Sequence, residues 1–104
     1  MPLTRDFKET IHERASRDAC FREALFKEAV DAVLSGDVET GKTVLRNYIN
    51  ATVGFDKLAT VTKKSSKSLM RMLGPKGNPD FRNFLEIVAY LQKREGVRLK
   101  VRAA

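Results

Sequence analysis

The stretch of sequence that decides the fold is FDKLATVTKKSSKSLMRML, residues 55–73. Its apolar residues recur at helical spacing on both sides of a polar break, TKKS, at residues 62–65. The spacing predicts one short helix from about Phe55 to Val61 and a second from Ser66 to Leu73. Ser65 can cap the second helix, because its hydroxyl accepts a hydrogen bond from a free backbone N–H at the helix start.

These two short helices have the residue types that a steep crossing requires. Ala59 is small enough for close approach, Leu58 and Leu69 supply the apolar contact, and Met72 lies behind them. We therefore predict a helix-turn-helix within this stretch.

Three further helices are predicted before this stretch, over about residues 4–17, 18–35 and 37–54. Each begins at a residue whose side chain can cap it: Thr4, Asp18 and Asp37. A loop with two Gly and two Pro follows at residues 74–79, and Pro79 suits the first turn of a last helix that stops at Gly96. The apolar residues predicted to pack from that helix are Phe81, Phe84, Leu85, Val88 and Leu91.

The tail after Gly96, VRLKVR at residues 97–102, alternates apolar and basic residues, which is a strand pattern. A lone strand needs a partner, and this chain offers no second convincing strand. We therefore predict that Val97, Leu99 and Val101 pair with the same tail of a second chain in a twofold dimer. The pattern leaves a frayed basic tail as the alternative.

The predicted fold class is all-α, a bundle of five to six helices that contains the helix-turn-helix and ends in a short strand. With 104 residues the chain fits one compact domain. Within it, residues 1–54 form an N-terminal helical region, a candidate partner or dimer surface. Residues 55–104 hold the helix-turn-helix and the tail.

The net charge of +7 favours a polyanionic partner such as nucleic acid. Residues 1–54 hold eight Lys and Arg against nine Asp and Glu, a net charge of −1. From Phe55 onward there are twelve Lys and Arg against four Asp and Glu, a net charge of +8. The positive excess therefore lies in the half that contains the helix-turn-helix.

The composition also disfavours several functional classes. No apolar run approaches the roughly 20 residues of a membrane span, and the start of the chain is charged rather than signal-like, so a cytoplasmic location is expected. The single cysteine, Cys20, begins an apolar helix and is expected to be buried, while His12 is expected to face solvent. Because one Cys and one His form neither a metal set nor a catalytic constellation, we expect no enzyme, metal or cofactor.

On the second helix of the motif, the predicted geometry leaves a polar face outward. Lys and Arg on that face can reach phosphates or guanine edges, and hydroxyls can contact either. The residues predicted to face outward are Ser66, Lys67, Met70 and Arg71. A sequence-independent phosphate contact is predicted from Lys63, Lys64 and Lys76.

The segment from Leu58-Ala59 to Leu73, followed by Gly77-Asn78-Pro79, resembles small Cro-like prophage regulators and addiction-module antidotes of the HigA type. The resemblance covers about residues 55–101. It implies a lambda-repressor-like fold with a recognition helix in the major groove of a palindromic operator. By the resemblance, the recognition helix and its start hold Ser65, Ser66, Lys67, Met70 and Arg71, and Asn78 lies in the following loop.

The sequence departs from this family in the turn. Lys63 stands where a glycine is common, so a left-handed backbone there would carry a cost. Lys64 stands where the family has an apolar residue, which removes a usual core contact.

The leading hypothesis is a dimeric, sequence-specific DNA-binding regulator of transcription, with repression favoured over activation. The alternative is an antitoxin whose first three helices cover a toxin partner and whose DNA binding serves autoregulation. An RNA-binding role is disfavoured, because no aromatic stacking surface is visible.

Overall fold

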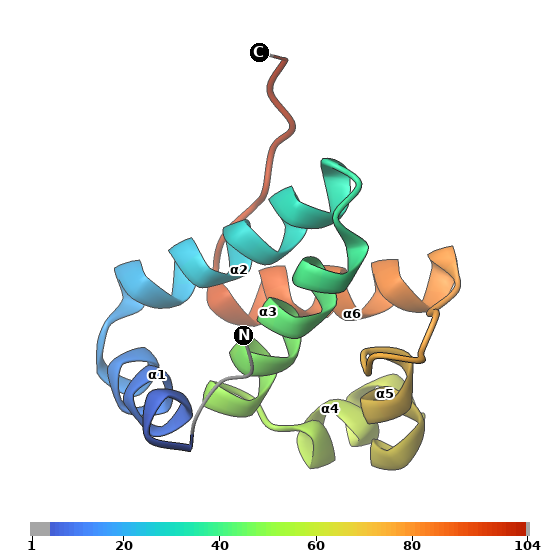
Figure 1. Cartoon of the computed structure of the whole chain (residues 1–104), viewed down its shortest axis with the longest axis horizontal. Helices are drawn as coiled ribbons and strands as arrows, with labels where there is room; N and C mark the ends of the chain where they lie inside the picture. Colours follow the sequence, from blue (N-terminus) through green and yellow to red (C-terminus); the bar gives the residue numbers. More distant parts are fainter. Residues whose placement is uncertain (1–4, 104) are drawn as a thin grey trace.

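The structure of the chain, a computed structural model, describes residues 5–103, with side chains from Lys8 onward. Within that range it has six helices and an extended C-terminal tail, so the all-α prediction is confirmed (Figure 1). None of these helices is long and apolar enough to cross a bilayer. The helices are α1 (Arg5–Arg17), α2 (Ala19–Leu34), α3 (Val38–Ala51), α4 (Phe55–Thr62), α5 (Ser66–Met72) and α6 (Phe81–Glu95).

Side-chain caps fix the starts of α2, α3 and α5, as predicted. The carboxylates of Asp18 and Asp37 accept from the backbone N–H three residues on, at 3.1 and 3.2 Å, and the Ser65 hydroxyl does so at 3.0 Å. The Phe21 N–H, aided by Arg14, lowers the pKa of Asp18. The predicted cap Thr4 lies outside the described residues.

The start of α6 differs from the prediction. Asp80 is its cap, accepting from the Asn83 N–H at 2.7 Å, so Pro79 precedes the helix instead of occupying its first turn. The Asp80 carboxylate can accept a hydrogen bond from a free backbone N–H at the start of the helix, whereas a proline side chain has no acceptor for that N–H.

One apolar core contains residues from both halves of the chain. Helices α2 and α3 contribute stacked rings of Phe26 and Tyr48, whose centroids lie 5.1 Å apart. The segment after Gly54 contributes side chains from α4, α5 and α6 to the same cluster. The sequence position where the net charge changes sign is therefore not a boundary in the packing.

A buried polar cluster joins α2, α3 and α6. The Glu95 side chain is only 4% exposed and accepts from the Tyr48 hydroxyl at 2.6 Å and from Arg22 Nε at 3.1 Å. Burial, reinforced by the bond to Glu95, raises the pKa of Tyr48. Because Arg22 Nη1 also donates to the Ala15 carbonyl at 2.7 Å, the cluster ties the end of α1 to this contact.

The side of α6 that faces the core was predicted only in part. Val88 and Leu91 are buried and Phe84 is half-buried, as expected, but Phe81 and Leu85 are exposed by 78% and 45%. The buried side instead passes through Ile87, from which Phe81 and Leu85 are turned away about the helix axis. Their prediction as core residues was wrong.

The C-terminal tail does not form the predicted strand within the described chain. Gly96 adopts a left-handed backbone, with φ of 74°, and ends α6 as predicted. The chain then turns so that Val97 and Leu99 pack against their own core, and the Leu99 N–H donates to Gln92 Oε1 at 2.8 Å. Of the three predicted pairing residues, Val101 alone is fully open, at 83% exposure.

Candidate nucleic-acid interface

Helices α4 and α5 pack across a three-residue turn at residues 63–65. Leu58 and Leu69 are fully buried at their contact, and Ala59 is half-buried beside them. The Lys64 N–H donates to the Ala59 carbonyl at 3.1 Å, which closes the end of α4. The residues predicted to hold the two helices together therefore lie at their interface.

Lys63 is the C-cap of α4 and adopts a left-handed backbone, with φ of 58° and ψ of 34°. Within the described chain it is the only non-glycine residue with a positive φ. An L-residue pays about 1 kcal/mol for this conformation relative to glycine. The conformational cost predicted for this turn position is therefore present, and the strained residue is charged and exposed.

Lys64 compensates for the missing apolar contact with an ion pair. Its side chain is 23% exposed, and Nζ lies 3.0 Å from Glu86 Oε2 in α6. The stem of a lysine can cover apolar surface while its ammonium reaches a partner. The ion pair therefore connects the turn to α6. Because Glu86 offsets part of its charge, Lys64 attracts a phosphate less strongly than an unpaired lysine would.

The outward side of α5 holds three of its four predicted residues. Lys67, Met70 and Arg71 are exposed. The Ser66 hydroxyl instead donates to Asp56 Oδ1 at 2.7 Å, which directs it toward the start of α4. A hydroxyl engaged in this way is less available to a ligand than the neighbouring cations.

A polar groove of about 550 Å³ runs between α5 and the start of α6. Among the described residues that line it are three cationic side chains and no carboxylate. It brings together five of the nine predicted residues, whereas Lys63, Ser66, Lys67 and Met70 lie outside its lining. The lining consists of Lys64, Ser65, Ser68, Arg71, Met72, Lys76, Gly77, Asn78 and Asn83.

The α5–α6 loop, residues 73–80, forms one wall of the groove and is held from behind by Lys42. This lysine of α3 has a side chain that is only 4% exposed, and Nζ donates to the Gly77 carbonyl at 2.6 Å. Lys42 was not among the residues predicted from the sequence. The available signal was its spacing, because Lys42 lies three residues before Leu45 and seven before Ile49, within the apolar stripe of α3.

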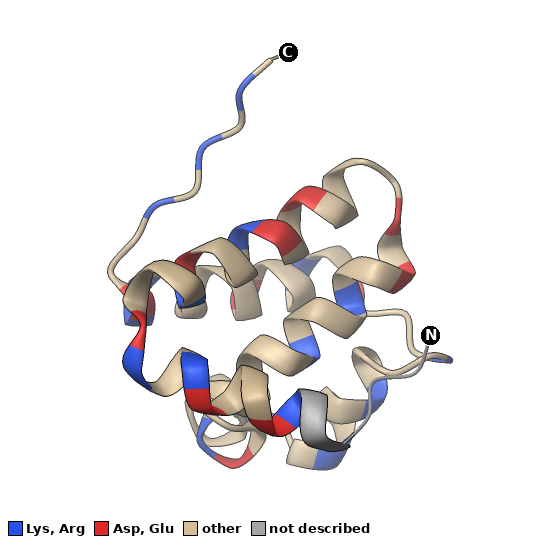
Figure 2. Cartoon of the chain, turned by 60° about the vertical axis from the view of Figure 1, so that its left-hand side comes forward, with Lys and Arg blue, Asp and Glu red and all other residues tan. Residues whose placement is uncertain are grey.

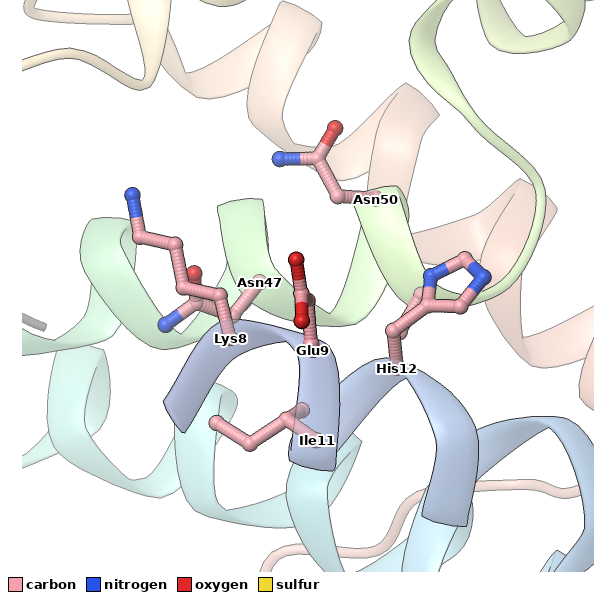
Figure 3. Close-up of a pocket in the computed structure, with 7 residues that line it drawn as sticks. Lys8, Glu9, Ile11, His12, Asn47 and Asn50 are labelled. Carbon is pink, nitrogen blue, oxygen red and sulfur yellow. The ribbon is translucent and has the colours of Figure 1, made fainter. Parts of the chain in front are cut away.

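A second hollow, of about 560 Å³, lies between α1 and α3. Figure 3 shows Lys8, Glu9 and His12 projecting from α1 on the side where Asn50 of α3 lies. Its lining has no residue in common with the polar groove. Because a carboxylate accompanies its basic groups, this hollow suits a polyanion less well than the groove does.

The positive charge of the second half is spread over two sides of the molecule. Figures 1 and 2 show the basic tail leaving the body on the side opposite α4 and α5. Arg98, Lys100 and Arg102, all exposed, lie on that tail. The positive charge on α4, α5 and the start of the following loop therefore comes from Lys57, Lys63, Lys64, Lys67, Arg71 and Lys76, with Asp56 opposing it.

Neither of the two isolated reactive groups lies in the groove. Cys20 is exposed, so the prediction of a buried thiol was wrong, and His12 is exposed as predicted. The described part of the chain holds no group of three or more His, Cys, Asp or Glu side chains able to bind a metal ion. Comparisons of the chain with protein-family models, with curated proteins and with solved structures found no match.

The strained backbone at Lys63 gives a first testable prediction. Lys63→Gly should raise the free energy of unfolding by about 0.5 kcal/mol, because glycine relieves the left-handed strain but loses more chain entropy on folding. If the lysine contacts a polyanion, the same change should weaken binding to duplex DNA and lower its salt dependence by about one unit. Urea unfolding and a DNA titration at several salt concentrations measure both effects. An unchanged salt dependence would exclude Lys63 from the interface.

Proposed function

We propose that this chain is a sequence-specific DNA-binding regulator of transcription in which α4 and α5 form a helix-turn-helix. The observation that carries the proposal is the polar groove beside α5, with its three cations and no carboxylate among the described lining residues. Phosphates are bound by such clusters of Lys, Arg and polar side chains. The resemblance of residues 55–101 to Cro-like regulators supports the same function.

In this proposal the two sides of α5 have different roles. Lys67, Met70 and Arg71 face a major groove, where Arg and Lys can donate to guanine O6 and N7 and a methionine can touch a thymine methyl. Lys76, Asn78 and Asn83 flank the helix and contact the phosphate backbone, which fixes how the helix sits. Ser66, held by Asp56, supports the start of α5 rather than reading a base.

The regulator is proposed to act as a homodimer on a twofold-symmetric operator, with repression of its own promoter as the expected effect. A single short recognition helix reads too few base pairs for selectivity. Two copies of the recognition helix, placed about one helical turn of DNA (roughly 34 Å) apart, contact twice as many base pairs.

The deciding experiment measures binding to the DNA upstream of the chain's own gene and to unrelated DNA, at two salt concentrations. Selective binding at physiological salt, with a footprint of two symmetric half-sites, is the expected result. Weak binding that is equal for both DNAs and disappears with salt would contradict a sequence reader and would favour a protein partner. A footprint of one half-site would contradict the dimer alone.

Arg71→Ala tests the position of the recognition helix. Losing a bidentate contact should weaken operator binding by about 10- to 100-fold, equal to about 1–3 kcal/mol, and should relax base preference at one position of each half-site. Arg98→Ala is the matched control, because it removes the same group from the opposite side of the molecule. Equal effects of the two changes would show that α5 is not the reading helix.

A further inference from the structure

Lys42 lies in α3, outside the helix pair, yet its ammonium ends beneath the α5–α6 loop. Nζ donates to the carbonyls of Gly74 at 3.0 Å and Gly77 at 2.6 Å, and lies 2.7 Å from Glu39 Oε2. An ammonium has three N–H donors, and these three acceptors match them. The buried charge of Lys42 is therefore compensated by a carboxylate and two carbonyls, and in the described chain no buried side-chain nitrogen or oxygen lacks a partner.

The two carbonyls that Lys42 binds mark the ends of one tight turn. The Gly77 N–H donates to the Gly74 carbonyl at 3.0 Å, and Pro75 occupies the second position, which its fixed φ favours. A Cβ on Gly77 would overlap the carbonyl oxygens of Arg71 and Met72. The loop is thus folded closely against the end of α5, and its carbonyl side points toward Lys42.

The turn fixes where two groove residues stand. Lys76 is its third residue, and Asn78 follows Gly77 directly. Both line the polar groove together with Arg71, whereas Lys42, being buried, does not. Lys42 therefore cannot contact a ligand in the groove, but its two bonds set the orientation of the backbone that carries Lys76 and Asn78.

We propose that Lys42 is a positioning residue for DNA binding, which holds the α5–α6 loop so that Lys76 and Asn78 meet the phosphates beside the recognition helix. The inference rests on the proposed function. An apolar side chain of the same length fills the space but donates nothing to the two carbonyls, so the loop is no longer held in one position. A change at Lys42 is expected to alter DNA binding by altering the contribution of Lys76. This dependence on Lys76 distinguishes a positioning role from simple support of the fold.

The test uses Lys42→Met, with Tyr48→Phe as the matched control. Tyr48→Phe also removes a buried hydrogen bond of α3, but the acceptor of that bond is Glu95 in α6 and not the loop. Under conditions where circular dichroism shows both variants folded, Lys42→Met should bind the operator about tenfold more weakly, and Tyr48→Phe should bind as the parent does.

A double-mutant cycle with Lys76→Ala supplies the readout that a structural role would not change. In the parent, Lys76→Ala should lower the salt dependence of binding by about one unit, and in the Lys42→Met background it should change little. Additive effects, or a folded Lys42→Met that binds as tightly as the parent, would overturn the inference. Should Lys42→Met not fold, Lys42→Gln, which keeps one N–H donor group, takes its place.

Amide hydrogen exchange separates failure of this inference from failure of the proposed function. If the parent binds no DNA, the proposed function fails while the claim about the loop stays testable. Exchange at the Gly77 N–H should then be faster in Lys42→Met and unchanged in Tyr48→Phe. Equal exchange in all three proteins would show that Lys42 does not hold the loop.

Discussion

Glu95→Ala is expected to lower the free energy of unfolding by about 3 kcal/mol. The Glu95 carboxylate is buried and accepts from both Tyr48 and Arg22. Removing it leaves the buried Tyr48 hydroxyl without its acceptor. Arg22, whose side chain is only 26% exposed, loses its carboxylate partner and keeps only the bond to the Ala15 carbonyl, so part of the desolvation cost of both groups is no longer compensated. Urea unfolding followed by circular dichroism measures the change.

Glu86→Ala is the control for this change on the same helix. Its carboxylate is 45% exposed and pairs with Lys64, so its removal should cost about 0.5 kcal/mol or less. Similar losses for the two variants would mean that the cluster around Glu95 does not stabilise the fold as the geometry indicates.

The same cluster predicts a pH dependence at the alkaline end. The pKa of Tyr48 is raised in the folded chain above its unfolded value of about 10, so the neutral phenol is the favoured form when folded. Its contribution to stability is complete below pH 10 and is lost as the pH rises above that value. Tyr48→Phe should therefore lose stability less steeply above pH 10 than the parent does.

Local signals in the sequence predicted the helices well. The caps Asp18, Asp37 and Ser65 act on backbone N–H groups three residues away, so a short window contains both partners. The partners of Lys42 and Glu95 could not be found in this way. Lys42 meets the loop 32 and 35 residues later, and Glu95 meets partners 47 and 73 residues earlier, so only the tertiary fold pairs them.

Two predictions rested on patterns that more than one structure satisfies. Alternation of apolar and basic residues after Gly96 suits a paired strand, but it equally suits an extended segment that packs Val97 and Leu99 on its own core. Helical periodicity identified α6 but did not fix which way the helix is turned, and Phe81 was placed on the wrong side.

The candidate interface was predicted from charge and motif together, and charge alone would have misplaced part of it. The net charge of the second half includes the cations of the tail, which leaves the body on the side away from α5 (Figures 1 and 2). A net charge along the sequence carries no information on which side of a fold each cation lies. The cluster in the groove depends on the loop, which brings Lys76 and Asn78 to Arg71.

Gly77→Ala is expected to have the largest effect on DNA binding of any single methyl group added to the chain. The new Cβ would overlap the carbonyl oxygens of Arg71 and Met72, which are backbone atoms and cannot rotate away. The loop must therefore move, at a cost of about 2–3 kcal/mol in the free energy of unfolding. Displacing Lys76 and Asn78 removes two contacts of about 1.4 kcal/mol each, which corresponds to operator binding about 100-fold weaker.

Gly74→Ala is the matched control for Gly77→Ala, because it adds the same methyl group at the other end of the same turn. Its Cβ would lie 3.2 Å from the Met70 carbonyl oxygen, so the backbone must shift by only a few tenths of an ångström, far less than at Gly77. Operator binding should then change by no more than about threefold, well under 1 kcal/mol. If both variants fold and lose affinity equally, disturbance of the turn in general would explain the loss. If Gly77→Ala folds and binds as the parent does, the loop takes no part in holding DNA, and the phosphate contacts must come from the turn between α4 and α5 instead.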